Sequence, residues 1–90
     1  MDTEQITARV IETIVERLEV PADTLSLETR FVEDLKADSL ALMELVLAFE
    51  ETFDIQANDE DSEKLRSVQD AVDFVTAQLA ATTQLEGQED

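Results

Sequence analysis

Turn residues are almost absent from this chain of 90 residues, which holds one glycine, Gly87, and one proline, Pro21. A β-sheet protein of this size needs several tight turns, which Asn-Gly, Asp-Gly and related glycine pairs usually form. The sequence contains none of these pairs. It therefore predicts an all-α fold. Because 90 residues can build only one workable hydrophobic core, it also predicts a single domain.

Apolar residues at helical spacing mark three main helices. The first should span residues 3–18, where apolar side chains recur every four residues, with a capping box at its start. The second should span residues 39–53, with Asp38 as its N-cap. The last should start at Ser67, whose hydroxyl can form a capping box with Asp70. These helices supply the main amphipathic faces of the predicted core.

The segments between and after the main helices complete the predicted architecture. Residues 20–37 lack periodicity but hold several large apolar side chains, so we expect an ordered connection there. Residues 59–65 favour one short helical turn. We expect the folded domain to span residues 1–81 and residues 82–90 to form a flexible C-terminal tail. The predicted fold is a four-helix bundle, with three main helices, one short helix and a long ordered loop between the first and second helices.

The net charge of −17 comes from 23 acidic and 6 basic residues. Such a chain repels nucleic acid and anionic membranes and favours partners with basic surfaces. No apolar run approaches transmembrane length, and the polar N-terminus is unlike a signal peptide. The absence of cysteine fits a cytoplasmic protein without disulfides. We therefore expect a cytoplasmic monomer that does not insert into membranes.

Catalytic side chains are scarce, because the chain has no histidine, cysteine, tyrosine or tryptophan. A serine nucleophile needs a base within hydrogen-bond reach. Lys36 lies near Ser39 in the sequence, but an acidic, exposed loop favours the protonated form of lysine, which is a poor base. The sequence thus argues against an enzyme.

The acidic segment 54–65 resembles an EF-hand calcium loop only at its start, where oxygen-bearing side chains alternate. Such a loop requires glycine at its sixth position and glutamate at its twelfth. This chain has Asp59 and Leu65 there. We therefore expect no dedicated metal site.

The second helix carries two apolar faces. The face predicted to meet the core comprises Leu42, Leu45, Val46, Phe49 and Phe53. A second face lies on roughly the opposite side of the helical wheel and comprises Leu40, Met43 and Leu47, with Glu44, Glu50 and Glu51 around it. Either the long connection covers part of this second face, or the face is a docking surface for a partner with a basic rim.

Ser39 stands at the start of that second face. Taken alone, a serine beside an aspartate at a helix start is an ordinary cap. In this context, however, the hydroxyl is predicted to be exposed where free backbone N–H groups and the helix dipole favour an attached phosphate. No neighbouring group makes the hydroxyl reactive. Ser39 is therefore a candidate for modification by another enzyme.

The sequence resembles the acyl carrier proteins from about Ile6 to Leu79. The family signature stands here as Asp38-Ser39-Leu40, within FVEDLKADSL. The resemblance continues through MELVLAFEETFDI, DEDSEKL and SVQDAVDFV, in the same order of helices. It implies a discrete carrier of the bacterial type II kind, and because this single carrier domain begins at Met1, we expect it to be free-standing.

The resemblance implies specific roles. A phosphopantetheinyl transferase would attach 4'-phosphopantetheine from coenzyme A to Ser39, and the thiol of that arm would carry acyl intermediates as thioesters. Partners would be acyl-synthase or acyltransferase enzymes with basic docking surfaces. The implied partner-binding residues are Asp38, Leu40, Met43, Glu44, Leu47, Glu50 and Glu51. The implied acyl-pocket residues, which also fit a plain core, are Val46, Phe49, Ala57, Leu65 and Ala71.

Three positions depart from the family pattern. Lys36 stands where the family usually has glycine, Ala41 replaces a commonly acidic residue, and Ala57-Asn58 replaces a frequent Ile-Pro pair. Fatty acid biosynthesis is the expected pathway. A polyketide or specialised lipid pathway is one alternative, and an unmodified acidic protein-interaction module is another from a different class.

Overall fold

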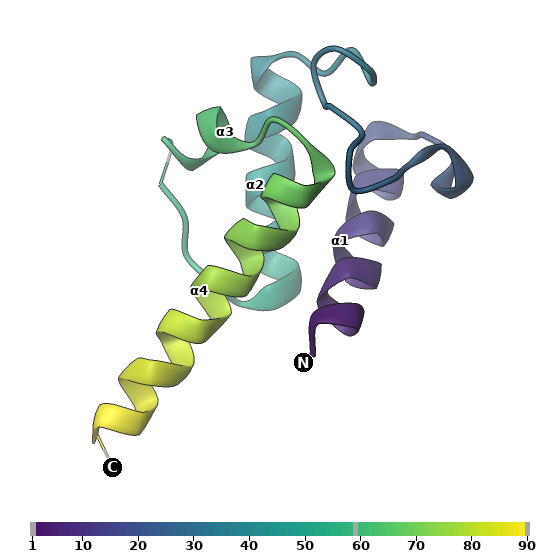
Figure 1. Cartoon of the computed structure of the whole chain (residues 1–90). Coiled ribbons are helices and arrows are strands. Elements are labelled where there is room, and N and C mark those ends of the chain that lie inside the picture. Colours follow the sequence, from purple (N-terminus) through teal and green to yellow (C-terminus); the bar gives the residue numbers. More distant parts are fainter. Residues whose placement is uncertain (1, 59, 90) are drawn as a thin grey trace.

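The structure is a computed structural model that describes residues 2–58 and 60–89, with the side chains described up to residue 80. Its elements in chain order are α1 (Thr3–Leu18), the 3-10 helix η1 (Ala22–Thr24), α2 (Ser39–Phe53), α3 (Asp61–Lys64) and α4 (Val68–Glu89). No strand occurs in the described part of the chain. The predicted all-α fold of three main helices and one short helix is confirmed (Figure 1).

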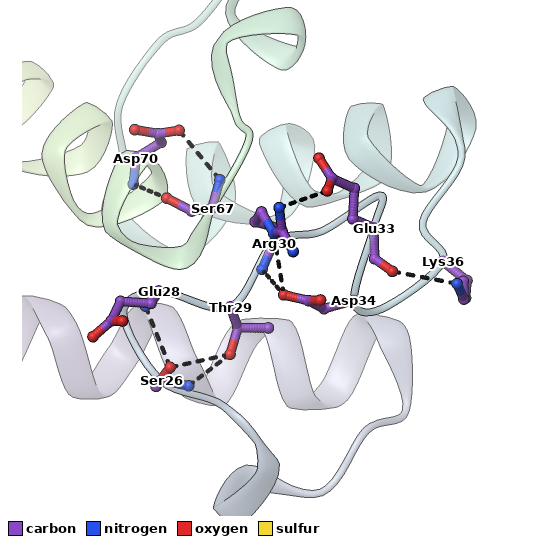
Figure 2. Close-up of polar contacts among 9 residues, drawn as sticks. All are labelled: Ser26, Glu28, Thr29, Arg30, Glu33, Asp34, Lys36, Ser67 and Asp70. Atoms are coloured by element: carbon purple, nitrogen blue, oxygen red, sulfur yellow. Dashed lines mark hydrogen bonds and ion pairs between the residues drawn. The ribbon is translucent and has the colours of Figure 1, made fainter.

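Side-chain caps fix where the main helices begin. At the start of α1, the Asp2 carboxylate accepts from Gln5 N at 2.9 Å, and the Gln5 side chain accepts from Asp2 N at 3.1 Å. At the start of α4, Asp70 N donates to Ser67 Oγ at 3.3 Å, and Ser67 N donates to the Asp70 carboxylate at 3.2 Å (Figure 2). Both predicted capping boxes are therefore present. Ser67 is the cap rather than the first residue of α4, one position from the expected start.

The hydrophobic core lies where α1, α2 and α4 meet. The α2 residues Leu45, Val46, Phe49 and Phe53 are buried, and Leu42 packs against the core while half-buried. This confirms the predicted core face of α2. In Figure 1, α2 lies beside α1, α3 lies on the other side of α2, and α4 crosses in front of α2. All three helices pack on α2, and α4 also packs on α1.

The connection between α1 and α2 is tied to the junction of α3 and α4. Phe31 is fully buried, and its backbone N–H donates to the carbonyl of Arg66 at 2.9 Å. The N–H of Val68 donates to the carbonyl of Thr29 at 2.9 Å, so a short antiparallel bridge joins the two segments. The connection therefore runs across the end of the bundle (Figure 1), and the buried Phe31 anchors it to the core.

Helix α4 ends at Glu89 and so includes most of residues 82–90, the segment expected to form a flexible tail. The side chains of residues 81–89 and the whole of residue 90 lie outside the described residues. The domain boundary at residue 81 and the flexibility of the tail therefore stay predictions. The short helix predicted within residues 59–65 is found as α3, while residue 59 itself lies outside the described residues.

Within residues 2–58 and 60–89, three residues other than glycine have a left-handed backbone. They are Glu19 and Asp54, which end α1 and α2, and Lys36 in the connection, with a φ of 60°. A β-carbon in this conformation costs roughly 1–2 kcal/mol. Glycine avoids that strain. The positive φ thus gives a physical reason for the glycine that the family usually has where this chain has Lys36.

Replacing Lys36 by glycine is expected to raise the free energy of unfolding by roughly 0.5–1 kcal/mol. The relief of left-handed strain exceeds the extra chain entropy that glycine loses on folding. Urea denaturation followed by circular dichroism measures the change. Lys36→Ala is the matched control, because it removes the ammonium group and keeps the β-carbon, so it should bring no gain. An equal gain in both variants would show that charge, not backbone strain, is the cause.

Candidate functional site

Ser39 is the first residue of α2, and its side chain is exposed. The cap of this helix is Asp38, whose carboxylate accepts from Ala41 N at 2.8 Å. The structure thus assigns the cap to Asp38. The hydroxyl of Ser39 makes no hydrogen bond with any described residue. Ser39 therefore presents an uncommitted hydroxyl to solvent at the positive end of the helix dipole.

The segment just before Ser39 is held by ion pairs and hydrogen bonds around Arg30 (Figure 2). The Arg30 guanidinium pairs with Glu33 at 2.6 Å and with Asp34 at 3.5 Å, and Lys36 Nζ donates to the Glu33 carbonyl at 3.3 Å. The Arg30 backbone N–H, which donates to the Asp34 carboxylate, is the main cause that lowers the pKa of Asp34 below its usual value. This contribution to stability is present above about pH 4 and is lost as the pH falls through the lowered pKa.

The second apolar face of α2 is open to solvent. Leu40, Met43 and Leu47 are 64%, 44% and 57% exposed. The connection between α1 and α2 therefore does not cover this face, which removes the first of the two interpretations considered for it. Of the acids around it, Glu44 and Glu51 are exposed, whereas Glu50 is half-buried.

A small pocket of about 70 Å³ lies between α2 and the segment that leads into α3. Met43, Val46, Leu47 and Glu50 from α2 line one side, and Ala57, Asn58 and Ser62 line the other. Four of these side chains are apolar, and the polar ones are Glu50, Asn58 and Ser62. Three residues of the expected partner-binding set, Met43, Leu47 and Glu50, thus also form a wall of this pocket.

The expected acyl-pocket residues fall into two groups. Val46 and Ala57 line the pocket. Phe49, Leu65 and Ala71 do not line it, and each is at most 2% exposed within the core. Leu65 instead lines a second hollow of about 460 Å³, which Val32 and Leu42 also line.

Sequence reasoning did not assign Asn58 or Ser62 to the pocket. Both are polar, so the apolar spacing that singled out the other residues gave no signal for them. A signal did exist for Met43, which lies three residues before the predicted wall residue Val46, and for Leu47, which lies four residues after Met43 on the same helix face.

Metal and membrane features are absent from the described residues. No group of three or more potential metal-ligating side chains comes together there. Among the same residues, no helix combines the length and apolar character that a transmembrane span needs. The site thus consists of an exposed hydroxyl, an apolar face with acidic surroundings, and a small pocket beneath that face.

Comparisons with known proteins agree with this arrangement. Residues 8–75 match the family described as "Phosphopantetheine attachment site". An acyl carrier protein of Akkermansia muciniphila is 47% identical over 75 residues, which cover 83% of this chain and 94% of that relative. The fold, site and family match first define a carrier domain that takes a covalent phosphopantetheine group.

The match to the Akkermansia protein covers most of both chains. This chain therefore belongs to the acyl carrier protein family. Members of this family are carriers rather than enzymes. Their cofactor is 4'-phosphopantetheine, and their partners are, in general, synthases and transferases. The lack of histidine, cysteine, tyrosine and tryptophan in this chain agrees with a carrier role.

Proposed function

We propose that Ser39 is the attachment point of 4'-phosphopantetheine and that the chain presents acyl thioesters on this arm to partner enzymes. The observation that carries the proposal is the exposed Ser39 hydroxyl, which Asp38 leaves free by capping the helix itself. The attachment forms a phosphodiester at Ser39 Oγ and breaks the diphosphate bond of coenzyme A. Adenosine 3',5'-bisphosphate leaves, and a base of the transferase takes the hydroxyl proton.

The residues around Ser39 fit a phosphodiester. The backbone N–H groups of Ser39 and Leu40, in the first turn of α2, have no acceptor within the described residues. Lys36 places a cation three residues before the hydroxyl. These groups favour a negative charge at the helix start, while the bound arm supplies the thiol that the chain lacks.

The docking surface that we propose is the exposed face of α2 and its first turn. It comprises Asp38, Leu40, Met43, Glu44, Leu47, Glu50 and Glu51. Support comes from the exposure of its three large apolar side chains, which no part of the described fold covers. Acids around an apolar centre suit partners with basic rims, such as the transferase and the acyl-synthase or acyltransferase enzymes.

The pathway that we propose is fatty acid biosynthesis. The named relative is an acyl carrier protein, which supports an acyl cargo without specifying its pathway. A polyketide or specialised lipid pathway is the alternative, motivated by the replacement of the usual Ile-Pro pair by Ala57-Asn58 at the pocket wall. Mass spectrometry of the acyl groups released from the native protein separates them. The cytoplasmic location and monomeric state expected from the sequence also stay predictions.

The test of the carrier role is the intact mass of the protein isolated from its own cells. We expect a population that carries one phosphopantetheine, with or without an acyl group. Purified unmodified protein incubated with coenzyme A and a broad-range transferase should gain the same single mass. Unmodified chain at every growth stage, together with no labelling in vitro, would favour an acidic interaction module without a cofactor.

Reversing Glu44 and Glu51 to lysine should slow acyl transfer to a partner enzyme about 10- to 1,000-fold at low salt. Both side chains are exposed beside the apolar face, where they can steer a basic partner. Transfer rates measured at two ionic strengths test this expectation. The matched control reverses Glu12 and Glu16 on α1, which changes the net charge equally but away from α2. Equal slowing in both double variants would indicate a net-charge effect and no local docking role.

A further inference from the structure

The segment that leads to Ser39 contains one closed turn, residues 30–35, which belongs to no helix (Figure 2). The Arg30 N–H donates to Oδ2 of Asp34 at 2.8 Å, and the Asp34 N–H donates back to the Arg30 carbonyl at 3.0 Å. The Leu35 N–H donates to the same carbonyl at 3.1 Å. Arg30 and Asp34 therefore bond to each other in both directions, and we call this pair of bonds the Arg30–Asp34 clasp.

One end of the turn is tied to the bundle. Phe31, which follows Arg30, is fully buried, and its N–H donates to the Arg66 carbonyl at 2.9 Å. Arg30 itself forms an antiparallel bridge with Ser67, the residue that caps α4. A well-packed core resists displacement of such an anchor. The start of the turn is therefore fixed relative to the helices.

The other end of the turn leads directly to Ser39. Ala37 is buried, and its N–H donates to the Phe31 carbonyl at 2.9 Å, which closes a larger loop around the clasp. Lys36, with its left-handed backbone, lies inside this loop. Asp38 follows and caps α2. The clasp thus lies between the anchor at Phe31 and the residue that carries the exposed hydroxyl.

The backbone bond is the part of the clasp that is best suited to hold the turn. The Arg30 guanidinium is shared between Glu33 and Asp34, and all three side chains are exposed to solvent. Ion pairs of this kind contribute little to stability. The Arg30 N–H, in contrast, has the Asp34 carboxylate as its one acceptor within the described residues. Hydrogen bonds to a charged acceptor are stronger than neutral ones, so loss of this oxygen should loosen the turn.

We propose that Asp34 is a positioning residue for the modification of Ser39, because its carboxylate holds the turn that presents Asp38 and Ser39 to the phosphopantetheinyl transferase in one conformation. This inference rests on the proposed attachment at Ser39. It concerns a residue four positions before the proposed docking surface. Asp34 acts through the backbone of the turn, and its role requires no contact with coenzyme A.

A preformed turn should affect binding of the chain more than the chemical step. When the turn is open for part of the time, the transferase binds only the fraction of chains in which it is closed. The apparent dissociation constant then rises by the inverse of that fraction. Once the chain is bound, the same hydroxyl oxygen of Ser39 attacks the diphosphate. Loss of the Asp34 carboxylate should therefore raise the KM for this chain and leave kcat nearly unchanged.

The first experiment measures the steady-state kinetics of phosphopantetheine transfer, with this chain as the varied substrate. Asp34→Ala should raise KM roughly tenfold and change kcat by less than about twofold. Asp34→Asn removes the same charge but keeps an oxygen that can accept from the Arg30 N–H, so it should recover most of the loss. A wild-type KM in Asp34→Ala would overturn the proposal.

The control for charge is Glu28→Ala. Glu28 is an exposed acid of the same connection, and its carboxylate bonds to no described residue. Its removal should leave KM within about twofold of the wild type, as expected for an acid outside the docking surface. If Asp34→Asn were as impaired as Asp34→Ala, the charge of Asp34 and not its hydrogen bond would be responsible, and the positioning role would be wrong.

The second experiment separates positioning from a general loss of stability. Amide hydrogen exchange of Arg30, measured by NMR in the unmodified protein, should rise roughly tenfold in Asp34→Ala and be largely restored in Asp34→Asn. Ile14→Val weakens the core at α1, away from the turn, and should leave KM unchanged. A KM for Ile14→Val as high as that for Asp34→Ala would reduce the effect to stability alone. Because wild-type chain is labelled beside every variant, failure of these differences is distinct from failure of wild-type labelling, which would overturn the carrier function itself.

Discussion

The Ser39→Ala chain should gain no mass when it is incubated with coenzyme A and a phosphopantetheinyl transferase, whereas the wild-type chain gains one phosphopantetheine. The loss should be complete, because the hydroxyl oxygen is itself the atom that forms the phosphodiester. Alanine should not disturb the helix, since Asp38 supplies the cap through Ala41 N and alanine is a good helix former. Intact-mass spectrometry gives the result directly.

Two controls make this result specific. Ser26→Ala removes another exposed serine hydroxyl, one that lies in a turn with Thr29 rather than at a helix start, and it should be labelled as the wild type is. The free energy of unfolding of Ser39→Ala should lie within about 0.5 kcal/mol of the wild type, as for an ordinary surface change. A labelled Ser39→Ala chain would show that another hydroxyl is the attachment point.

Phe31→Ala should lower the free energy of unfolding by about 3–5 kcal/mol, the largest loss expected of any single change considered. The ring is fully buried, and its removal leaves a cavity between the connection and the helices. The backbone N–H of Phe31 also donates to the Arg66 carbonyl, and the Phe31 carbonyl accepts from the N–H of Ala37. Since small domains are stable by only about 5–15 kcal/mol, the variant should be close to unfolding. Urea denaturation measures the shift of the midpoint.

The neighbouring residue supplies the matched control for Phe31. Val32 is 54% exposed, and Val32→Ala should change the free energy of unfolding by less than about 1 kcal/mol. Phe31→Leu, which keeps much of the buried volume, should recover most of the loss. If Phe31→Ala and Val32→Ala were equally stable, the ring would not anchor the connection to the core.

The confirmed predictions of helix ends and helix faces rest mostly on local sequence patterns. The ends of α1 and the start of α2 follow from caps and apolar spacing, which depend on residues only three or four positions apart. The separation of Leu40 from Phe49 on opposite faces of α2 follows from the helical repeat alone. The position of Ser39 beside Asp38 also follows from the sequence. The Asp38 cap and the exposed Ser39 hydroxyl were both predicted and are confirmed.

Long-range packing explains the rest. The expected acyl-pocket set was drawn from position in the family pattern, which does not separate a pocket wall from the core behind it. Phe49 and Ala71 turn out to lie fully within the core, whereas the polar Asn58 completes the wall. The loop before α3 has no periodicity, so no pattern predicted where Ala57 would lie or that its N–H would reach Glu50.

The sequence by itself determined an all-helical carrier with one exposed serine at the start of a two-faced helix, because helix periodicity and capping are local. Only the tertiary structure decided that the connection leaves Leu40, Met43 and Leu47 uncovered and that Glu50 holds the pocket wall. Both features depend on how the α1–α2 connection and the loop before α3 pack against α2. That position depends on the burial of Phe31 and Ile55 in the core, which α1, α2 and α4 form only when they pack together.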